Sequence, residues 1–312
     1  MTMEEVNRIE PNGSTALHVA AYRGYEKIVE LLLNYGASCV AINNHNCTPL
    51  GEAKTIKIKQ MIRRSMNATR SVSNSCWDIL STNDTDFQAH EYKKKLEAYG
   101  KDPHFYHLIG YIRQNYLEKE LHDIDGINII QEYFDKAINE KDPTYLLKAY
   151  SAKTGFYSAL NNHLAQLQLE DLSAKQNLSL SYFIGIIAHH QKFETLSYIG
   201  QLFRGMMITT NDIKQYTIGT RILTKIFVST SKQRDLALNF LQQIPDEDDR
   251  LSAICVYEIR NARTAFDIPD VSLFPDEREA LILPYSAFQI IDIKQNRMSL
   301  PRLEIKLREL ER

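Results

Sequence analysis

Three short segments in the second half of the sequence carry side chains that can do chemistry. They read FRG at 203–205, FVSTS at 227–231 and FPDEREALILP at 274–284. The last places Glu277 and Glu279 at i and i+2, immediately before an apolar run. Residues i and i+2 of an extended strand point to the same face, so both carboxylates can face one cleft if the turn ends at or before Glu277. The two carboxylates can then have different tasks at one site.

The elements that must position these segments are strands that follow a helical region. From about residue 90 to residue 174 the apolar residues have helical spacing. Strand-like runs come next: TLSYIGQLFRGM, ILTKIFVSTS, AICVYEIR, EALILP, AFQIIDI and LEIKLREL. Helices followed by strands indicate an α+β domain with mainly antiparallel sheets. The sequence contains neither common type of glycine-rich phosphate loop, so a nucleotide would have to be held in another way.

Length, charge and cysteine content limit the function classes. The chain has 312 residues, which is enough for about two domains. Its 37 Lys and Arg nearly balance 39 Asp and Glu, so no strong field selects nucleic acid or an anionic membrane surface as a partner. Four cysteines without a C-x-x-C pair disfavour a disulfide framework and a structural zinc site. The acidic, polar start and the lack of an apolar stretch of about 18 residues lead us to expect a soluble, cytoplasmic protein.

A repeated pattern lies near the N-terminus. The spacing Thr-x-Leu-x-x-Ala at 15–20 recurs at 48–53, and this shift is the period of the ankyrin repeat. The first copy, NGSTALHVAAYRGYEKIVELLLNYGAS, resembles an ankyrin repeat closely. It predicts a first helix from about Thr15 to Tyr22, a break at Gly24 and a second amphipathic helix capped by Gly36.

The second copy departs from the ankyrin pattern, because Gly51 stands where the first copy has His18 and no long apolar helix follows. About one and a half repeats remain, whereas about three are usually needed for independent stability. The fragment is therefore either a module that binds a protein partner or a structural cap. We expect an ankyrin fragment over 1–66, a linker rich in Ser, Thr and Asn over 67–88, and a second domain over 89–312.

The three segments of the second half, in this order, resemble the arginine, serine and glutamate elements of the mono-ADP-ribosyltransferases. The similarity is to the toxin-like and vertebrate arginine-specific branch, whose last element reads Glu-x-Glu, and it extends over residues 150–164, 203–240 and 255–288. It implies an enzyme that breaks the bond between nicotinamide and ribose in NAD and transfers ADP-ribose to an arginine of an acceptor protein. It also implies helices packed on split, mainly antiparallel sheets.

The resemblance gives the two glutamates separate roles. In this family the transition state is similar to an oxocarbenium ion, so a carboxylate bound to the ribose 2′-OH stabilises the developing positive charge. That role falls to Glu279. Glu277 is then the residue that orients the incoming guanidinium and assists its deprotonation, which arginine requires because its pKa is above about 12. A first glutamate in this pair is what the family associates with arginine as the acceptor.

By the same resemblance, the other two segments bind NAD and support the glutamate. Arg204 makes a charge-assisted bond to the NAD phosphates. Gly205 lacks a side chain, which lets its backbone approach the nicotinamide carboxamide. Ser229 holds Glu279 in position, and the two residues after it support the strand.

Two further stretches resemble parts of this family. Residues 268–275, which include Phe274, are similar to the turn that contacts the acceptor. Tyr150 and Thr154 lie in a stretch that resembles the helical region near the cofactor. Which residues hold the adenine is not evident from the sequence.

No metal is expected, because His189 and His190 lack Cys or acidic partners at the spacing of metal ligands. Two alternatives to the transferase stay open. The same residues could mainly hydrolyse NAD, or modify an acceptor that is not a protein. The chain could also be a non-catalytic ankyrin scaffold that carries a degenerate domain.

Overall fold

The chain forms two compact units, residues 1–72 with 153–155 and residues 73–152 with 156–312. The computed structural model describes residues 6–35, 37–39, 41, 43–45, 47–55, 57–59, 61–62, 77–80, 84–152, 154–209, 213–239, 241, 250–268, 271–272, 278–296 and 301–310. All statements below concern these residues.

The first unit consists of short helices. These are α2 (Ala16–Arg23), α3 (Glu26–Asn34) and α4 (Pro49–Glu52). The backbone N–H of Thr15 donates to Nδ1 of His18 (3.1 Å) at the start of α2, and Gly24 ends this helix with a φ of 84°. Glycine adopts this left-handed conformation without strain. The first helix expected from about Thr15 to Tyr22 and the break at Gly24 are confirmed.

His18 connects the two copies of the repeat. Its ring is fully buried, and its Nε2 is 3.0 Å from the carbonyl oxygen of Cys47 in the second copy. Gly51, which replaces this histidine in the second copy, lies in α4, a helix of only 4 residues. Gly36, the expected cap of the second helix, lies outside the described residues.

The first unit carries a set of large apolar side chains that are about half exposed or more. They are Ile9, Val19, Tyr22, Tyr25, Ile28, Leu31 and Tyr35. Such side chains suit a module that packs against a further surface. A protein partner for this unit stays a prediction.

The helices of the second unit precede most of its strands, as the sequence predicts. They are α6 (Thr85–Gly100), α7 (Phe105–Ile112), α8 (Ile127–Asn139), α9 (Thr144–Ser151), α10 (Phe156–Gln166), α11 (Leu178–His189) and the later α13 (Arg234–Asn239). Shorter helical turns are the π-helix η2 (Arg113–Leu117) and the 3₁₀ turns η3 (Glu170–Ser173), η4 (Lys175–Asn177) and η5 (Gln191–Leu196).

Within the described residues, nine strands form one sheet in the order β1-β3-β8-β9-β5-β2-β4-β7-β6. The strands are β1 (Trp77–Leu80), β2 (Gly200–Thr209), β3 (Arg221–Thr224), β4 (Val228–Ser231), β5 (Arg250–Ile259), β6 (Ala265–Asp267), β7 (Glu279–Ile282), β8 (Ala287–Gln295) and β9 (Leu303–Glu309). The pairing is antiparallel except between β5 and β9, which are parallel. The described part of the chain therefore has the expected α+β class with a mainly antiparallel sheet.

The sheet has a weak junction between β2 and β4. These two strands are in register at a single described pair, Phe203 with Ser231, whereas β2 and β5 pair over ten residues, from Gly200 with Ile259 to Thr209 with Arg250. Strands β4, β7 and β6 thus form a small group beside the larger group of six. This division agrees with the expectation of split sheets.

The segment expected to be a linker over 67–88 differs from that expectation at its C-terminal end. Residues 77–80 form β1, which pairs antiparallel with β3, and α6 already begins at Thr85. Pairing with a distant strand overrides the local Ser, Thr and Asn composition, because strand formation depends strongly on tertiary context. Residues 67–76 lie outside the described part of the chain.

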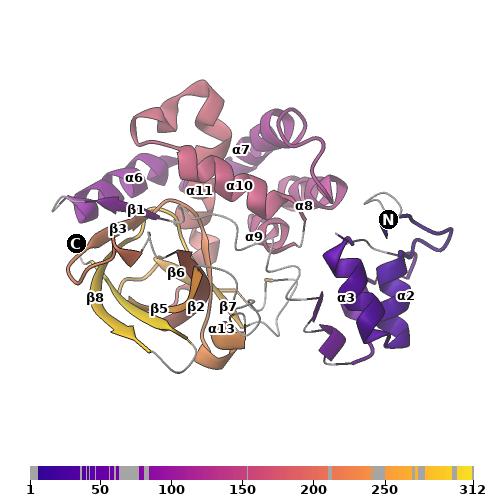
Figure 1. Cartoon of the computed structure of the whole chain (residues 1–312). Helices are drawn as coiled ribbons and strands as arrows, with labels where there is room; N and C mark the ends of the chain where they lie inside the picture. The colour runs from indigo at the N-terminus through magenta and orange to yellow at the C-terminus, as the bar shows by residue number, and fades with distance from the viewer. Residues whose placement is uncertain are drawn as a thin grey trace. The chain divides into compact units, whose positions relative to one another are not determined.

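One hydrophobic core joins the helices and the sheet of the second unit. It contains buried residues of α6 to α11 together with those of the strands, and α7 to α11 gather above the strands in Figure 1. Tyr92 of α6 stacks on Tyr285, with ring centroids 3.9 Å apart. No helix in the described residues is both long enough and apolar enough to cross a membrane.

Candidate active site

The fold brings the three predicted segments together on neighbouring strands. Arg204 lies on β2, Ser229 on β4 and Glu279 on β7, and these strands are adjacent in the sheet. The register pairs Phe203 with Ser231 across β2 and β4, and Ser231 with Glu279 across β4 and β7. Side chains separated by tens of residues in sequence therefore meet at one place.

Ser229 and Glu279 are bonded directly. The hydroxyl of Ser229 donates a short hydrogen bond to Oε1 of Glu279. Ser229 pairs with Leu281 and Glu279 with Ser231, so the two residues are diagonal neighbours on one face of the sheet, within reach of a long side chain. Glu279 is only 4% exposed. A buried carboxylate held by a hydroxyl has a fixed orientation, because the bond to a charged acceptor is strong.

The side chain of Arg204 contacts the backbone of the same serine. Its Nη1 donates to the carbonyl oxygen of Ser229 at 2.8 Å, and the residue is half-buried. This bond links β2 to β4 at their weak junction. A guanidinium has five N–H donors, so one bond to the backbone is compatible with the phosphate contact that the sequence predicts.

Gly205 is required by packing within the fold. A Cβ atom at this position would lie 2.3 Å from the carbonyl oxygen of Ala237 in α13 and 3.1 Å from Leu241. Real Cβ atoms do not approach backbone oxygen so closely, so a side chain here would displace α13. The close approach observed at Gly205 is thus to a helix, and its contact with nicotinamide stays a prediction.

The sequence argument for the two glutamates required that the turn end at or before Glu277, and the structure does not meet this condition. Strand β7 begins at Glu279, and Arg278 has a φ of 44°, which is left-handed and not extended. Side chains at i and i+2 share a face only when the backbone between them is extended. The expectation that Glu277 and Glu279 share a face therefore loses its basis. Glu277 itself lies outside the described residues.

The turn expected to contact the acceptor is described only in part. The backbone N–H groups of Val271 and Ser272 donate to the carbonyl oxygen of Ile268, at 3.1 and 2.7 Å. Ile268 is buried and anchors the start of this turn. Phe274 lies outside the described residues, so its role stays a prediction.

Tyr150 belongs to the core and positions the serine strand. It is 1% exposed, and its ring centroid is 4.8 Å from that of Phe227. Its hydroxyl oxygen accepts a bond from Nδ2 of Asn161 (3.1 Å), while Oδ1 of Asn161 accepts from the backbone N–H of Phe227 (3.3 Å). Phe227 immediately precedes β4, so this chain of bonds holds the strand that carries Ser229. A near-cofactor role for Tyr150 and Thr154 stays a prediction.

Asn161 is a positioning residue that the sequence analysis missed. It is 5% exposed and lies on α10. A polar amide is seldom buried without partners, so its place among apolar residues in FYSALNNHL was the signal. The local pattern could not identify the partner, because Phe227 is 66 residues away.

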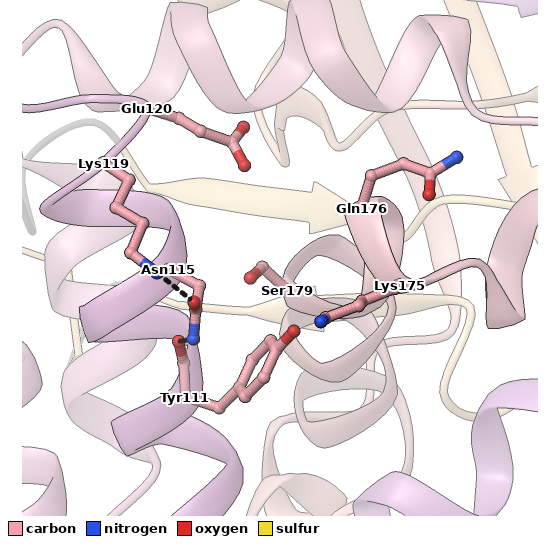
Figure 2. Close-up of a pocket in the computed structure, with 7 residues that line it drawn as sticks. All are labelled: Tyr111, Asn115, Lys119, Glu120, Lys175, Gln176 and Ser179. Carbon is pink, nitrogen blue, oxygen red and sulfur yellow. Dashed lines mark hydrogen bonds between the residues drawn. The ribbon is translucent and has the colours of Figure 1, made fainter.

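The helical region contains a separate hollow, shown in Figure 2. It has a volume of about 360 Å³ and is lined by Tyr111, Asn115, Lys119, Glu120, Lys175, Gln176 and Ser179. Lys119 donates to Oδ1 of Asn115 (2.8 Å), and Nδ2 of Asn115 donates to the carbonyl oxygen of Tyr111 (3.1 Å). Three of the lining residues are thus joined by hydrogen bonds, and none of the residues expected to bind NAD lines this hollow.

The described residues contain no group of three or more His, Cys, Asp or Glu side chains that could hold a metal ion. Of the two histidines considered in the sequence, His189 lies at the end of α11 and His190 caps it. Burial lowers the pKa of His189 to about 4. The expectation that no metal is needed stays a prediction.

Comparison with known proteins adds two findings. Residues 12–45 match the family model of the ankyrin repeat, which confirms the repeat expected from the sequence. Among curated proteins, none has significant sequence similarity to the chain.

Several solved structures of ADP-ribosyltransferases are similar to this chain. One is Vis of Vibrio splendidus in complex with agmatine, with 14% identity over 78% of this chain and 90% of Vis, and a TM-score of 0.41. Another is HopU1 of Pseudomonas syringae pv. tomato DC3000, with 14% identity over 74% of this chain and 98% of HopU1, and a TM-score of 0.43. A third is exoenzyme S of Pseudomonas aeruginosa bound to carba-NAD, with 14% identity over 64% of this chain and 88% of that one, and a TM-score of 0.42.

The resemblance to ADP-ribosyltransferases stated from the sequence is thus met again among solved structures. TM-scores below 0.5 describe only partial similarity of shape, and they do not address the arginine-specific branch. The function proposed next therefore rests on the residues of this chain.

Proposed function

We propose that this protein is an NAD-dependent protein-arginine mono-ADP-ribosyltransferase. The observation that carries the proposal is the bond from the Ser229 hydroxyl to the buried carboxylate of Glu279. The side chain of Arg204 donates a hydrogen bond to the backbone carbonyl oxygen of the same serine. A carboxylate and a guanidinium that are both bonded to one serine suit two charged parts of NAD, the ribose that becomes positive and the phosphates that are negative.

Glu279 stabilises the transition state in this proposal. The bond between ribose C1′ and the nicotinamide nitrogen breaks, and its electron pair leaves with nicotinamide. Positive charge develops on the ribose, and a carboxylate bound to the 2′-OH stabilises it. The carboxylate is already oriented by Ser229, so no reorganisation is needed during the reaction. Arg204 holds the phosphates, and the backbone at Gly205 binds the carboxamide.

The acceptor step completes the reaction. A guanidinium nitrogen forms the new bond to C1′ and loses one proton, for which Glu277 is the proposed acceptor. Because arginine is a poor nucleophile while protonated, this step needs a base near the acceptor. If water takes the place of arginine, the same cleavage gives free ADP-ribose, and the protein is then an NAD glycohydrolase.

The test is a comparison of two product measurements on the full chain. Nicotinamide release reports cleavage, and the mass spectrum of agmatine, a small guanidino compound, reports transfer. The variants are Glu279→Gln and Glu277→Gln. Glu258→Gln is the matched control, because Glu258 lies on β5 of the same sheet in an ion pair with Arg308 at 2.9 Å.

We expect Glu279→Gln to lose both activities and Glu277→Gln to keep cleavage but lose transfer, while Glu258→Gln behaves as the wild type. Unchanged cleavage in Glu279→Gln would remove the basis of the proposal. Free ADP-ribose as the sole product of the wild type, with a range of acceptors, would identify a hydrolase instead.

A further inference from the structure

An ion pair crosses the start of β7, the strand that begins with Glu279. Lys232 follows the last residue of β4, and Asp267 is the last residue of β6. Strand β7 lies between β4 and β6 in the sheet. The Nζ atom of Lys232 nevertheless reaches Oδ2 of Asp267, at 2.6 Å. The pair therefore bridges the two strands that flank β7.

The ends of these strands coincide with the start of β7. Ser231, the residue before Lys232, pairs with Glu279, and Asp267 pairs with Ala280. Both charged side chains consequently lie at the N-terminal end of β7. The first residue of β7 is Glu279, whose carboxylate is proposed to stabilise the transition state.

The backbone at the start of β7 is strained, and its hydrogen bonds to both neighbouring strands are long. Arg278 has a φ of 44°, which is unfavourable for a residue with a side chain and persists only where surrounding structure holds it. The backbone N–H of Lys232 donates to the carbonyl oxygen of Arg278 at 3.4 Å, and that of Ile268 donates to Glu279 at 3.2 Å. These distances are at or beyond the long end of ordinary hydrogen bonds, so a further restraint is needed here.

We propose that Lys232 and Asp267 form a clamp that positions the Glu279 carboxylate for catalysis. The inference rests on the proposed function. Ser229 fixes the end of the Glu279 side chain, while the clamp fixes the backbone from which this side chain starts. Both are needed to define the position of the carboxylate, and a displacement of about 1 Å can lower a rate by about 100-fold.

The clamp differs from an ordinary surface ion pair in what it affects. Its side chains are 29% and 34% exposed, and pairs of this kind contribute little to global stability. A purely structural pair could loosen the neighbouring backbone when removed, but it would leave kcat unchanged. A clamp changes kcat while KM for NAD and the melting temperature stay nearly constant.

The first experiment measures kcat and KM for NAD cleavage in Lys232→Met, Asp267→Asn and the double variant. Lys232→Arg keeps the charge and serves as the conservative rescue. Arg308→Met is the matched control, since it removes the pair between β9 and β5 in the same sheet. We expect kcat to fall about 10- to 100-fold in both single variants, and no further in the double variant, because the two residues act as one unit.

The second experiment does not depend on activity. Hydrogen exchange is followed at the backbone N–H groups of Lys232 and Ile268, which bond to either side of the start of β7. Exchange should be faster in Lys232→Met and Asp267→Asn, and unchanged in Arg308→Met, because removal of the clamp loosens both bonds.

The two experiments separate the clamp from the proposed function. A wild type that releases no nicotinamide, combined with faster exchange in the clamp variants, refutes the proposed function and with it the catalytic role of the clamp. An active wild type whose clamp variants keep kcat within about twofold refutes the clamp alone. A fall in kcat that Lys232→Arg restores, at constant melting temperature, supports it.

Discussion

Replacing Ser229 by alanine tests the contact on which the proposed function depends. The variant removes the hydroxyl that donates to Glu279 and leaves a carboxylate that is 4% exposed without this donor. Hydrogen bonds to charged groups contribute about 1.5 to 3 kcal/mol. If the whole of this hydrogen-bond energy stabilises the transition state, its loss lowers kcat by about 10- to 150-fold.

The neighbouring residue on β4 provides the control. Thr230 is also buried, at 6% exposure, and its hydroxyl donates to the backbone carbonyl of Ala280 at 2.6 Å. Successive residues of a strand point to opposite faces, so this hydroxyl lies away from the carboxylate. Thr230→Val keeps the volume and removes a buried hydrogen bond, which costs about 1 to 3 kcal/mol of stability without loss of kcat.

The assay is steady-state release of nicotinamide at saturating NAD with agmatine as acceptor, and the melting temperature of each variant is measured in parallel. Ser229→Ala should lose rate more than stability, and Thr230→Val the reverse. If Ser229→Ala is folded and cleaves NAD at the wild-type rate, Ser229 does not position the reacting carboxylate and the reasoning is refuted. Equal loss of rate in both variants would show a general effect of disturbing β4.

Three further predictions concern stability. Gly205→Ala should destabilise the fold by about 1 to 3 kcal/mol in urea denaturation, because its Cβ would lie 2.3 Å from the carbonyl oxygen of Ala237. Asn161→Leu should cost about 1 to 3 kcal/mol by the same measurement, since the buried N–H of Phe227 loses its acceptor. Burial lowers the pKa of His189 from 6.5 to about 4, so between these values the unfolded chain binds a proton that the folded chain does not. Stability should therefore fall as the pH falls from 6.5 to 4, by at most about 3 kcal/mol, and His189→Gln should reduce this loss when unfolding is compared at the two pH values.

Most of the strands could be predicted from the sequence because their signal is local, although the single run ILTKIFVSTS forms two strands, β3 and β4. In LEIKLREL the residues Leu303, Ile305 and Leu307 alternate with charges, and all three are buried in β9. Apolar runs around the three site segments placed them on strands in the same way. Their convergence, in contrast, came from the resemblance to a family and not from periodicity, because the adjacency of β2, β4 and β7 is a property of the whole sheet.

Features that depend on distant partners could not be predicted. Trp77–Leu80 lies in a stretch that reads as a linker and becomes a strand because β3 offers it an edge. The packing requirement at Gly205, where a side chain would collide with α13, was likewise not evident from the sequence. Lys232 and Asp267 lie 35 residues apart, and neither has a neighbour in sequence that marks it as half of an ion pair.

The left-handed conformation of Arg278 changes how the two glutamates must be considered. The residue between them is an arginine and not a glycine or asparagine, the residues typical of a turn, so the sequence predicted an extended strand. With a φ of 44° at Arg278, the direction of the Glu277 side chain is no longer tied to that of Glu279 by strand alternation. The separate tasks proposed for the two residues do not depend on such alternation, because Glu279 is held within the sheet by Ser229. Arg278→Val introduces a residue that favours extended backbone and should therefore change the direction of the residue before it. Transfer to agmatine should then fall more than NAD cleavage, because only transfer needs the first glutamate at the acceptor.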